Sequence, residues 1–235
     1  MLIIPALVHI ALSFISISND LKLAVFLLSA LPAAASSAAI INALNFKSEL
    51  DVILTVTTSA IAPFTLTGLF FVLYGKSLHF DLLSFFITNA ILVLVPMIAA
   101  KLLMTKLHKV AQEHAVGIDI LSISLIALLF AAAIAVNKPN IHLENGVLQE
   151  QVIIFVSLFL TFVASFVLSF GLKKDEIVAF CASKIFTSIL LGITIASQFL
   201  GSGVAAIMTM AIIPWSVMFI VFKLYGRLKK LKLYG

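Results

Sequence analysis

Two short stretches of the chain combine hydroxyl side chains with interruptions of an otherwise apolar sequence. They are Pro32–Ser37 and Ser183–Ser188. Hydroxyl and ammonium groups donate hydrogen bonds, and an ammonium also adds positive charge, so together they can bind an anion. The side chains that we expect at such a substrate or ion site are Ser36, Ser37, Thr55, Thr58, Ser183, Lys184, Thr187, Ser188 and Thr209. Each threonine taken singly could instead bond back to its own helix.

Lys184 is the most informative of these residues. An ammonium group near the centre of a bilayer costs roughly 3 kcal/mol on insertion scales. All ten acidic residues, Asp51 among them, lie in loops or at the ends of apolar segments, so we expect no carboxylate partner at membrane depth. Lys184 then binds an anionic substrate, rests on helix-end carbonyls and nearby hydroxyls, or extends to the membrane surface near Asp175.

The composition is that of a polytopic all-α membrane protein. The chain has 235 residues, of which 63% are hydrophobic and 11% charged, and its mean hydropathy is +1.23. Apolar stretches of about 20 residues, which span a hydrocarbon layer as helices, follow one another with short polar gaps. We predict about eight transmembrane helices, near residues 2–17, 21–46, 49–75, 79–105, 118–136, 148–171, 176–199 and 203–225.

The two interrupted regions belong to an internal repeat. Ile61–Thr65 aligns with Ile212–Ser216, which places Pro63 on Pro214. These prolines fall in the third and eighth segments, an odd number of crossings apart, so the copies face opposite ways. Inverted repeats with discontinuous helices are typical of secondary transporters. We expect helix breaks at Pro32, Pro63 and Pro214, and a second broken helix at 183–188.

Charge and motifs narrow the function further. The net charge of +5 comes from loop lysines, so we expect no nucleic-acid binding. Most of these lysines fall on the side of the basic tail, which predicts cytoplasmic termini in the cell (inner) membrane. No enzymatic motif is present, and Cys181 has no partner for a disulfide. We expect no metal site: His9 is a packed polar residue, and the loop histidines lack metal spacing. The latter are His79, His108, His114 and His142.

The stretch Leu27–Ser37, followed by Thr55–Thr58 and Ala62–Pro63, resembles the bile acid:sodium symporter superfamily. The chain looks like a divergent, N-terminally short member that is similar to a lysine-containing branch. The resemblance implies a ten-helix fold of two inverted repeats that here lacks the first two helices. It implies a core domain with crossed broken helices at 1–75 and 148–226, panel-type helices at 76–147 and a basic cytoplasmic tail at 227–235.

Within this resemblance, Ser37 and Thr55 match a serine and a threonine of the family's sodium site. Ala38 stands where the family has asparagine, and Phe180–Lys184 lacks the glutamate and glutamine that ligate sodium in coupled members. Our hypothesis is that the ammonium of Lys184 replaces the charge of sodium. Transport would then be uncoupled or proton-linked, and no cofactor is expected.

We therefore predict a secondary active transporter that binds a small organic anion where the broken helices cross, between Ser36/Ser37 and Lys184/Thr187/Ser188. The expected partners are this anion and the lipid bilayer. Two alternatives stay open: a permease of the auxin-efflux or malonate-carrier type, and a non-transporting remnant membrane protein. If the first two family helices are truly absent, a second copy in a homo-oligomer would have to supply the panel helices.

Overall fold

The computed structural model describes residues 2–43, 46–47, 49–75, 81–113, 115–141 and 146–231. These residues form helices joined by short connections, in the order expected from the eight apolar segments. The helices are α1 (Ile3–Ser13), α2 (Asn19–Ala30), α3 (Ala35–Ala43), α4 (Glu49–Tyr74), α5 (Leu82–Glu113), α6 (Ala115–Asn137), the 3₁₀ turn η1 (Lys138–Asn140), α7 (Val147–Leu168), α8 (Lys174–Ile185), α9 (Ile189–Ile195), the π-helical turn η2 (Ala196–Leu200), α10 (Ser202–Met210) and α11 (Ile212–Leu231).

The protein is a polytopic all-α membrane protein. Within the described residues, four helical stretches are long and apolar enough to cross a bilayer: Glu49–Tyr74, Leu82–Leu103, Val147–Leu168 and Ser202–Leu224. The segments predicted at 21–46 and 176–199 are absent from this set because each is divided into two short helices, α2–α3 and α8–α9. The prediction of two discontinuous helices is therefore confirmed.

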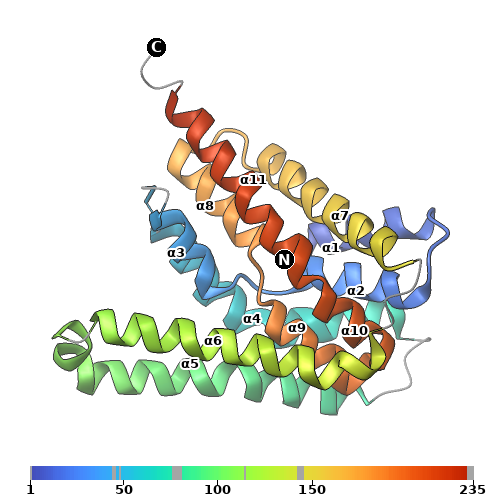
Figure 1. The fold of residues 1–235 in the computed structure, drawn as a ribbon, viewed down its shortest axis with the longest axis horizontal. Coiled ribbons are helices and arrows are strands. Elements are labelled where there is room, and N and C mark those ends of the chain that lie inside the picture. The colour runs from blue at the N-terminus through green and yellow to red at the C-terminus, as the bar shows by residue number, and fades with distance from the viewer. Residues whose placement is uncertain are drawn as a thin grey trace.

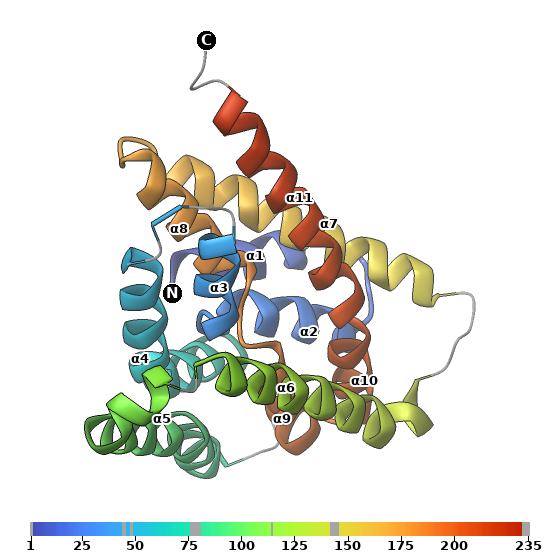
Figure 2. The ribbon, with the colours of Figure 1, turned by 60° about the vertical axis from the view of Figure 1, so that its left-hand side comes forward.

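The helices form three groups (Figures 1 and 2). The pair α5 and α6 lies along one side, and α7, α8 and α11 lie on the opposite side. The helices α2, α3, α9 and α10 lie between these groups, and α4 packs against both α5 and α8. Many apolar side chains on α5 and α7 are exposed, which suits helix faces that contact lipid. The buried core includes the interrupted helices: α2 contributes seven of its buried apolar residues and α8 contributes five.

The connection between α5 and α6 is shorter than the sequence suggested. The polar stretch after residue 105 was expected to leave the helix, but α5 continues to Glu113 and α6 begins at Ala115. His108, expected in a loop, therefore lies in α5. Lysine, glutamate, glutamine and alanine are good helix formers, so the helix can continue beyond its apolar part. His79, His114 and His142 lie outside the described residues.

Aromatic rings pack α1, α2 and α4 against one another in the first half of the chain. Phe26 of α2 is fully buried, and its ring centroid lies 5.3 Å from that of Phe70 and 5.0 Å from that of Tyr74, both on α4. His9 Nδ1 lies 3.1 Å from the Tyr74 hydroxyl oxygen, so His9 is a packed polar residue, as expected. Edge-to-face rings of this kind stabilise a packed interface beyond their buried area.

Replacing Phe26 by alanine should therefore destabilise the fold. We expect Phe26→Ala to lower the free energy of unfolding by about 3 kcal/mol, because a buried ring is exchanged for a cavity. Phe71→Ala is the matched control, since Phe71 lies on α4 and is 62% exposed. Thermal unfolding in detergent should show a clear loss for the first variant and little change for the second; equal effects would contradict this packing.

Candidate functional site

The two interrupted spans meet at their breaks and pair through their backbones. The N–H of Ala34 donates to the carbonyl of Phe186 at 2.9 Å, and the N–H of Ser188 donates to the carbonyl of Pro32 at 2.9 Å. Ala33 and Thr187 face each other in this short antiparallel pair. The four half-helices α2, α3, α8 and α9 therefore end at one point of the structure, as the predicted crossing requires.

The first break follows directly from Pro32. The residue before a proline is disfavoured in helical conformation, and Leu31 adopts extended angles of φ −58° and ψ 146°, so α2 ends at Ala30. The freed N–H of Ala33 donates to Thr58 Oγ1 on α4 at 3.2 Å. Thr58, predicted to bind substrate or ion, thus holds the unwound backbone in place.

The second break has no proline, and tertiary contacts define it. Phe186 ends α8 with φ −89° and ψ 72°. Its ring is fully buried, with centroids 5.7 Å from the ring of Trp215 and 5.6 Å from that of Phe222, both on α11. These ring contacts and the backbone bonds to Pro32 and Ala34 together stabilise the extended segment Phe186–Ser188.

A cavity of about 260 Å³ opens beside the crossing. Both breaks contribute to its wall, through Pro32 and Ser188, and α4 contributes the hydroxyls of Thr55 and Ser59. The other side chains that line it are apolar: Val56, Leu92, Val93, Met97 and Leu191. Of the predicted site residues, Thr55 and Ser188 line this cavity. It lies between the interrupted helices and α5, where two groups of helices meet.

Several oxygens around the crossing are buried without a hydrogen-bond partner in the described part of the chain. They are Thr55 Oγ1, Thr187 Oγ1 and Asp51 Oδ1. Buried polar atoms are nearly always paired, and an unpaired one is costly, so oxygens left unpaired at one place mark where a ligand can bind. Two of the three belong to threonines that the sequence analysis assigned to the site.

Asp51 is the residue that the sequence analysis missed. It was placed at a segment end, away from membrane depth, yet it is fully buried. Ser37 Oγ lies 2.7 Å from Asp51 Oδ2 and 2.7 Å from the carbonyl oxygen of Ala34. Asp51 and Thr55 lie four residues apart on α4, hence on one face. This spacing from Thr55 is the feature of the sequence that could have assigned Asp51 to the site. In the structure, the hydrogen bond with Ser37 links Asp51 to the first break.

The remaining predicted residues do not line the cavity. Ser183 and Thr209 are buried, and each donates back to its own helix, to Phe180 O at 2.8 Å and Ala205 O at 2.7 Å. Ser36 is partly buried in the first turn of α3. Lys184 is partly buried in the last turn of α8, where a positive charge interacts favourably with the helix dipole.

The prediction of a helix break at Pro63 is wrong. Pro63 is buried inside α4, which continues unbroken from Glu49 to Tyr74. A neighbouring helix can accommodate a proline in a membrane helix, and α5 packs along α4 here. Pro214 lies in the first turn of α11, just after the interruption at Ala211 that separates α10 from α11. A proline in a first turn removes no helical hydrogen bond.

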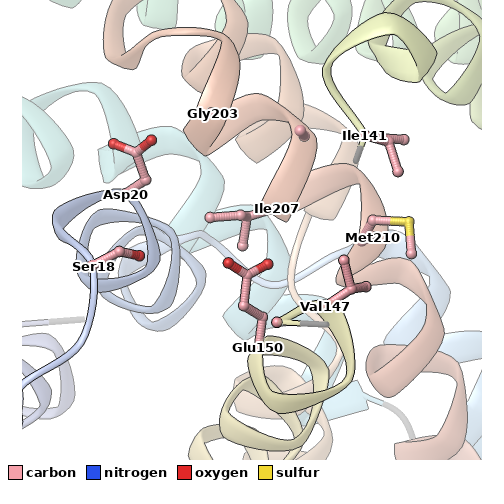
Figure 3. A pocket seen from close by; sticks show the side chains of 10 residues that line it. Ser18, Asp20, Ile141, Val147, Glu150, Gly203, Ile207 and Met210 are labelled. Carbon is pink, nitrogen blue, oxygen red and sulfur yellow. The ribbon is translucent and has the colours of Figure 1, made fainter. Parts of the chain in front are cut away.

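A second cavity, of about 380 Å³, lies at the N-terminal ends of α2 and α7 (Figure 3). The carboxylates of Asp20 and Glu150 enter it from different helices, and Ile207 of α10 lies between them in this view. Gly203, near the start of α10, leaves room for the Asp20 carboxylate. This cavity includes neither break. Among the described residues, no three His, Cys, Asp or Glu side chains are grouped to hold a metal.

Comparison with known proteins identifies the family. The sequence profile of the Sodium Bile acid symporter family matches residues 2–145. The chain belongs to this family. The match covers the first break, α4 and α5, which include Asp51, Thr55 and the α5 wall of the crossing cavity. The search of individual curated proteins found no match. Membership of a symporter family makes the crossing the place to look for a transported molecule.

Thr58 should contribute to stability because it holds the first break. Thr58→Val keeps the side-chain shape but removes the acceptor of the Ala33 N–H, which leaves a buried donor unpaired. We expect a loss of about 1–3 kcal/mol in the free energy of unfolding. Thr57→Val on the same helix is the control, because Thr57 is exposed. Thermal unfolding in detergent measures both, and an unchanged midpoint for Thr58→Val would refute the assigned role.

Proposed function

We propose that the chain carries a small organic anion across the cell membrane by alternating access, with the substrate bound in the cavity at the crossing. The observation that carries this proposal is the antiparallel pairing of two interrupted helices beside a cavity that a third helix, α5, completes. Non-helical backbone at membrane depth is tolerated where protein buries it or where it lines a cavity. Both conditions are met at this crossing.

The electrostatics of the cavity favour a negative substrate. Two helix N-termini, of α3 and of the stretch Ile189–Leu200, lie at the crossing together with the C-termini of α2 and α8, so the opposite partial charges of these helix ends offset one another. None of the side chains that line the cavity is acidic. Lys184 adds a full positive charge one residue before α8 ends. Hydroxyls of Thr55, Ser59 and Ser188 can donate hydrogen bonds to carboxylate oxygens.

The size of the cavity favours a small substrate. Pockets for drug-sized ligands occupy roughly 300–1,000 Å³. The crossing cavity, at about 260 Å³, lies below that range and suits an acid of a few carbon atoms better than a bile acid. The substrate class that we propose therefore differs from the one in the name of the family.

The packing of α5 suggests how access alternates. At its beginning, Phe85 is fully buried, and its ring lies between Phe70 of α4 at 5.3 Å and Phe199 of η2 at 5.1 Å. Beyond the cavity, Ile98 and Leu102 of α5 are exposed. Ring contacts therefore hold the beginning of α5 against α4 and η2. Rocking of α5 and α6 against the interrupted helices would separate these rings and close the opposite side.

Lys184 favours coupling without sodium, since it lies in the last turn of α8, two residues before the break at Phe186. A second scheme is favoured by Asp51. Its unpaired Oδ1, with Thr55 Oγ1 one turn away and Ser37 Oγ on Oδ2, is a set of oxygens that suits a small cation. The two schemes differ in which residue controls ion dependence.

Filling the cavity should stop transport while the fold survives. In proteoliposomes, we expect wild-type protein to take up labelled acids such as propionate or lactate, but not taurocholate. Ser59→Phe should reduce uptake at least roughly tenfold, as expected if binding loses about 1.4 kcal/mol. Ser84→Phe, on an exposed position of α5, is the control. If no small carboxylate or sulfate is taken up by a well-folded protein, the transport proposal fails.

The coupling schemes separate in uptake assays with and without sodium. We expect sodium-independent uptake that Lys184→Ala abolishes and that Lys223→Ala, at an exposed position, retains. Uptake that requires sodium and is unchanged in Lys184→Ala would eliminate the lysine scheme. Loss of that sodium dependence in Asp51→Asn would then support the cation scheme.

A further inference from the structure

Asn89 is a fully buried asparagine on α5 that neither the predicted site nor the crossing cavity includes. Its Nδ2 donates to the carbonyl of Phe85, one turn earlier on the same helix, at 2.8 Å. Its Oδ1 is buried and has no hydrogen-bond partner in the described part of the chain. The bond to Phe85 orients the amide, because the reverse orientation would place two carbonyl oxygens together. Asn89 Oδ1 is therefore a buried hydrogen-bond acceptor that no donor among the described residues reaches.

Asn89 lies on α5 between the aromatic contact of Phe85 and the residues that line the crossing cavity. Phe85, Asn89 and Val93 follow at intervals of four, so they share one face of α5. Phe85 packs between Phe70 and Phe199, whereas Val93 lines the crossing cavity. The intervening positions Ile87 and Ile91 are exposed and belong to the opposite face. Asn89 thus lies one turn before Val93 and one turn after Phe85, between the cavity lining and the ring contact.

An unpaired amide oxygen inside a membrane protein is costly, because neither water nor lipid is there to pair with it. Asparagines in membrane helices usually bond across to a neighbouring helix. The structure shows no such bond to Asn89 Oδ1 from the described residues. Such an unpaired oxygen is accounted for if a ligand, or another conformation of the protein, donates a hydrogen bond to it.

We propose that Asn89 is a specificity-determining residue, whose Oδ1 accepts a hydrogen bond from a hydroxyl or ammonium group of the substrate. When the rings around Phe85 separate, the cavity extends along α5 to Asn89, and the substrate donor reaches Oδ1. The inference rests on the proposed function and refines it: the carried anions are small acids with a hydrogen-bond donor, such as hydroxy acids or amino acids. Hydroxyls near the crossing bind the carboxylate, and Asn89 binds the donor.

The test compares L-lactate with propionate, which lacks its hydroxyl. We expect wild-type protein to take up lactate in preference to propionate by at least roughly tenfold, since a site that pairs a buried polar group rejects the analogue without it. Asn89→Leu should lose this preference and still take up propionate. Asn137→Leu is the matched control: Asn137 is also buried and bonds back to its own helix, at Ala133 O, but lies at the far end of α6.

Thermal unfolding separates this role from a structural one. Because Asn89 Oδ1 has no partner, Asn89→Leu should leave the unfolding midpoint unchanged or raise it. A lower midpoint would show that Asn89 stabilises the fold and would overturn the inference. An intact lactate preference in Asn89→Leu, or wild-type uptake of both acids without preference, would also overturn it, while the carrier itself stands. Absence of uptake of every acid by folded wild-type protein would instead refute the proposed function.

Discussion

The structure depends on the backbone pairing of two unwound segments inside a membrane protein. Each interrupted helix leaves N–H and C=O groups free, and lipid cannot bond to them. At the crossing, Pro32–Ala34 and Phe186–Ser188 pair with each other, and Thr58 takes the N–H of Ala33. Neither interruption could persist alone at this depth, because each supplies partners for the other. This mutual dependence explains why the two interrupted spans meet at their breaks.

The crossing also concentrates polarity in an otherwise apolar chain. Two helix N-termini, several hydroxyls and Lys184 lie at or beside it, and most of the surrounding surface is aliphatic or aromatic. Electrostatic interactions are stronger where water is scarce, so a few polar groups can contribute strongly to binding the proposed anion. The same scarcity makes unpaired oxygens informative. In the described part of the chain, Asp51, Thr55, Thr187 and Asn89 hold four of the six buried side-chain oxygens without a partner, and the other two belong to Thr67 and Gln151.

The helix α5 connects the binding region with the part of the molecule that we propose to move during transport. Its beginning is fixed to α4 and η2 by the ring of Phe85, whereas its later part exposes apolar side chains on most of its surface. In the proposed transport cycle, these ring contacts separate while the paired breaks stay intact. The crossing would then be the rigid part of the proposed carrier, and the helix pair α5 and α6 the part that moves.

The sequence by itself determined the all-α membrane class, the order of the apolar segments and the first break, because hydropathy and the steric effect of Pro32 act locally. It also indicated the second break through its hydroxyl-rich stretch, and it identified Thr55, Ser188 and Lys184 as residues of the region. Only the tertiary structure decided which of these residues line the cavity. It also decided that Pro63 lies in a continuous helix, that Asp51 is buried against Ser37 and that Asn89 has a free acceptor. The physical reason is that burial and hydrogen-bond pairing depend on neighbours from distant segments, and a single segment does not specify them.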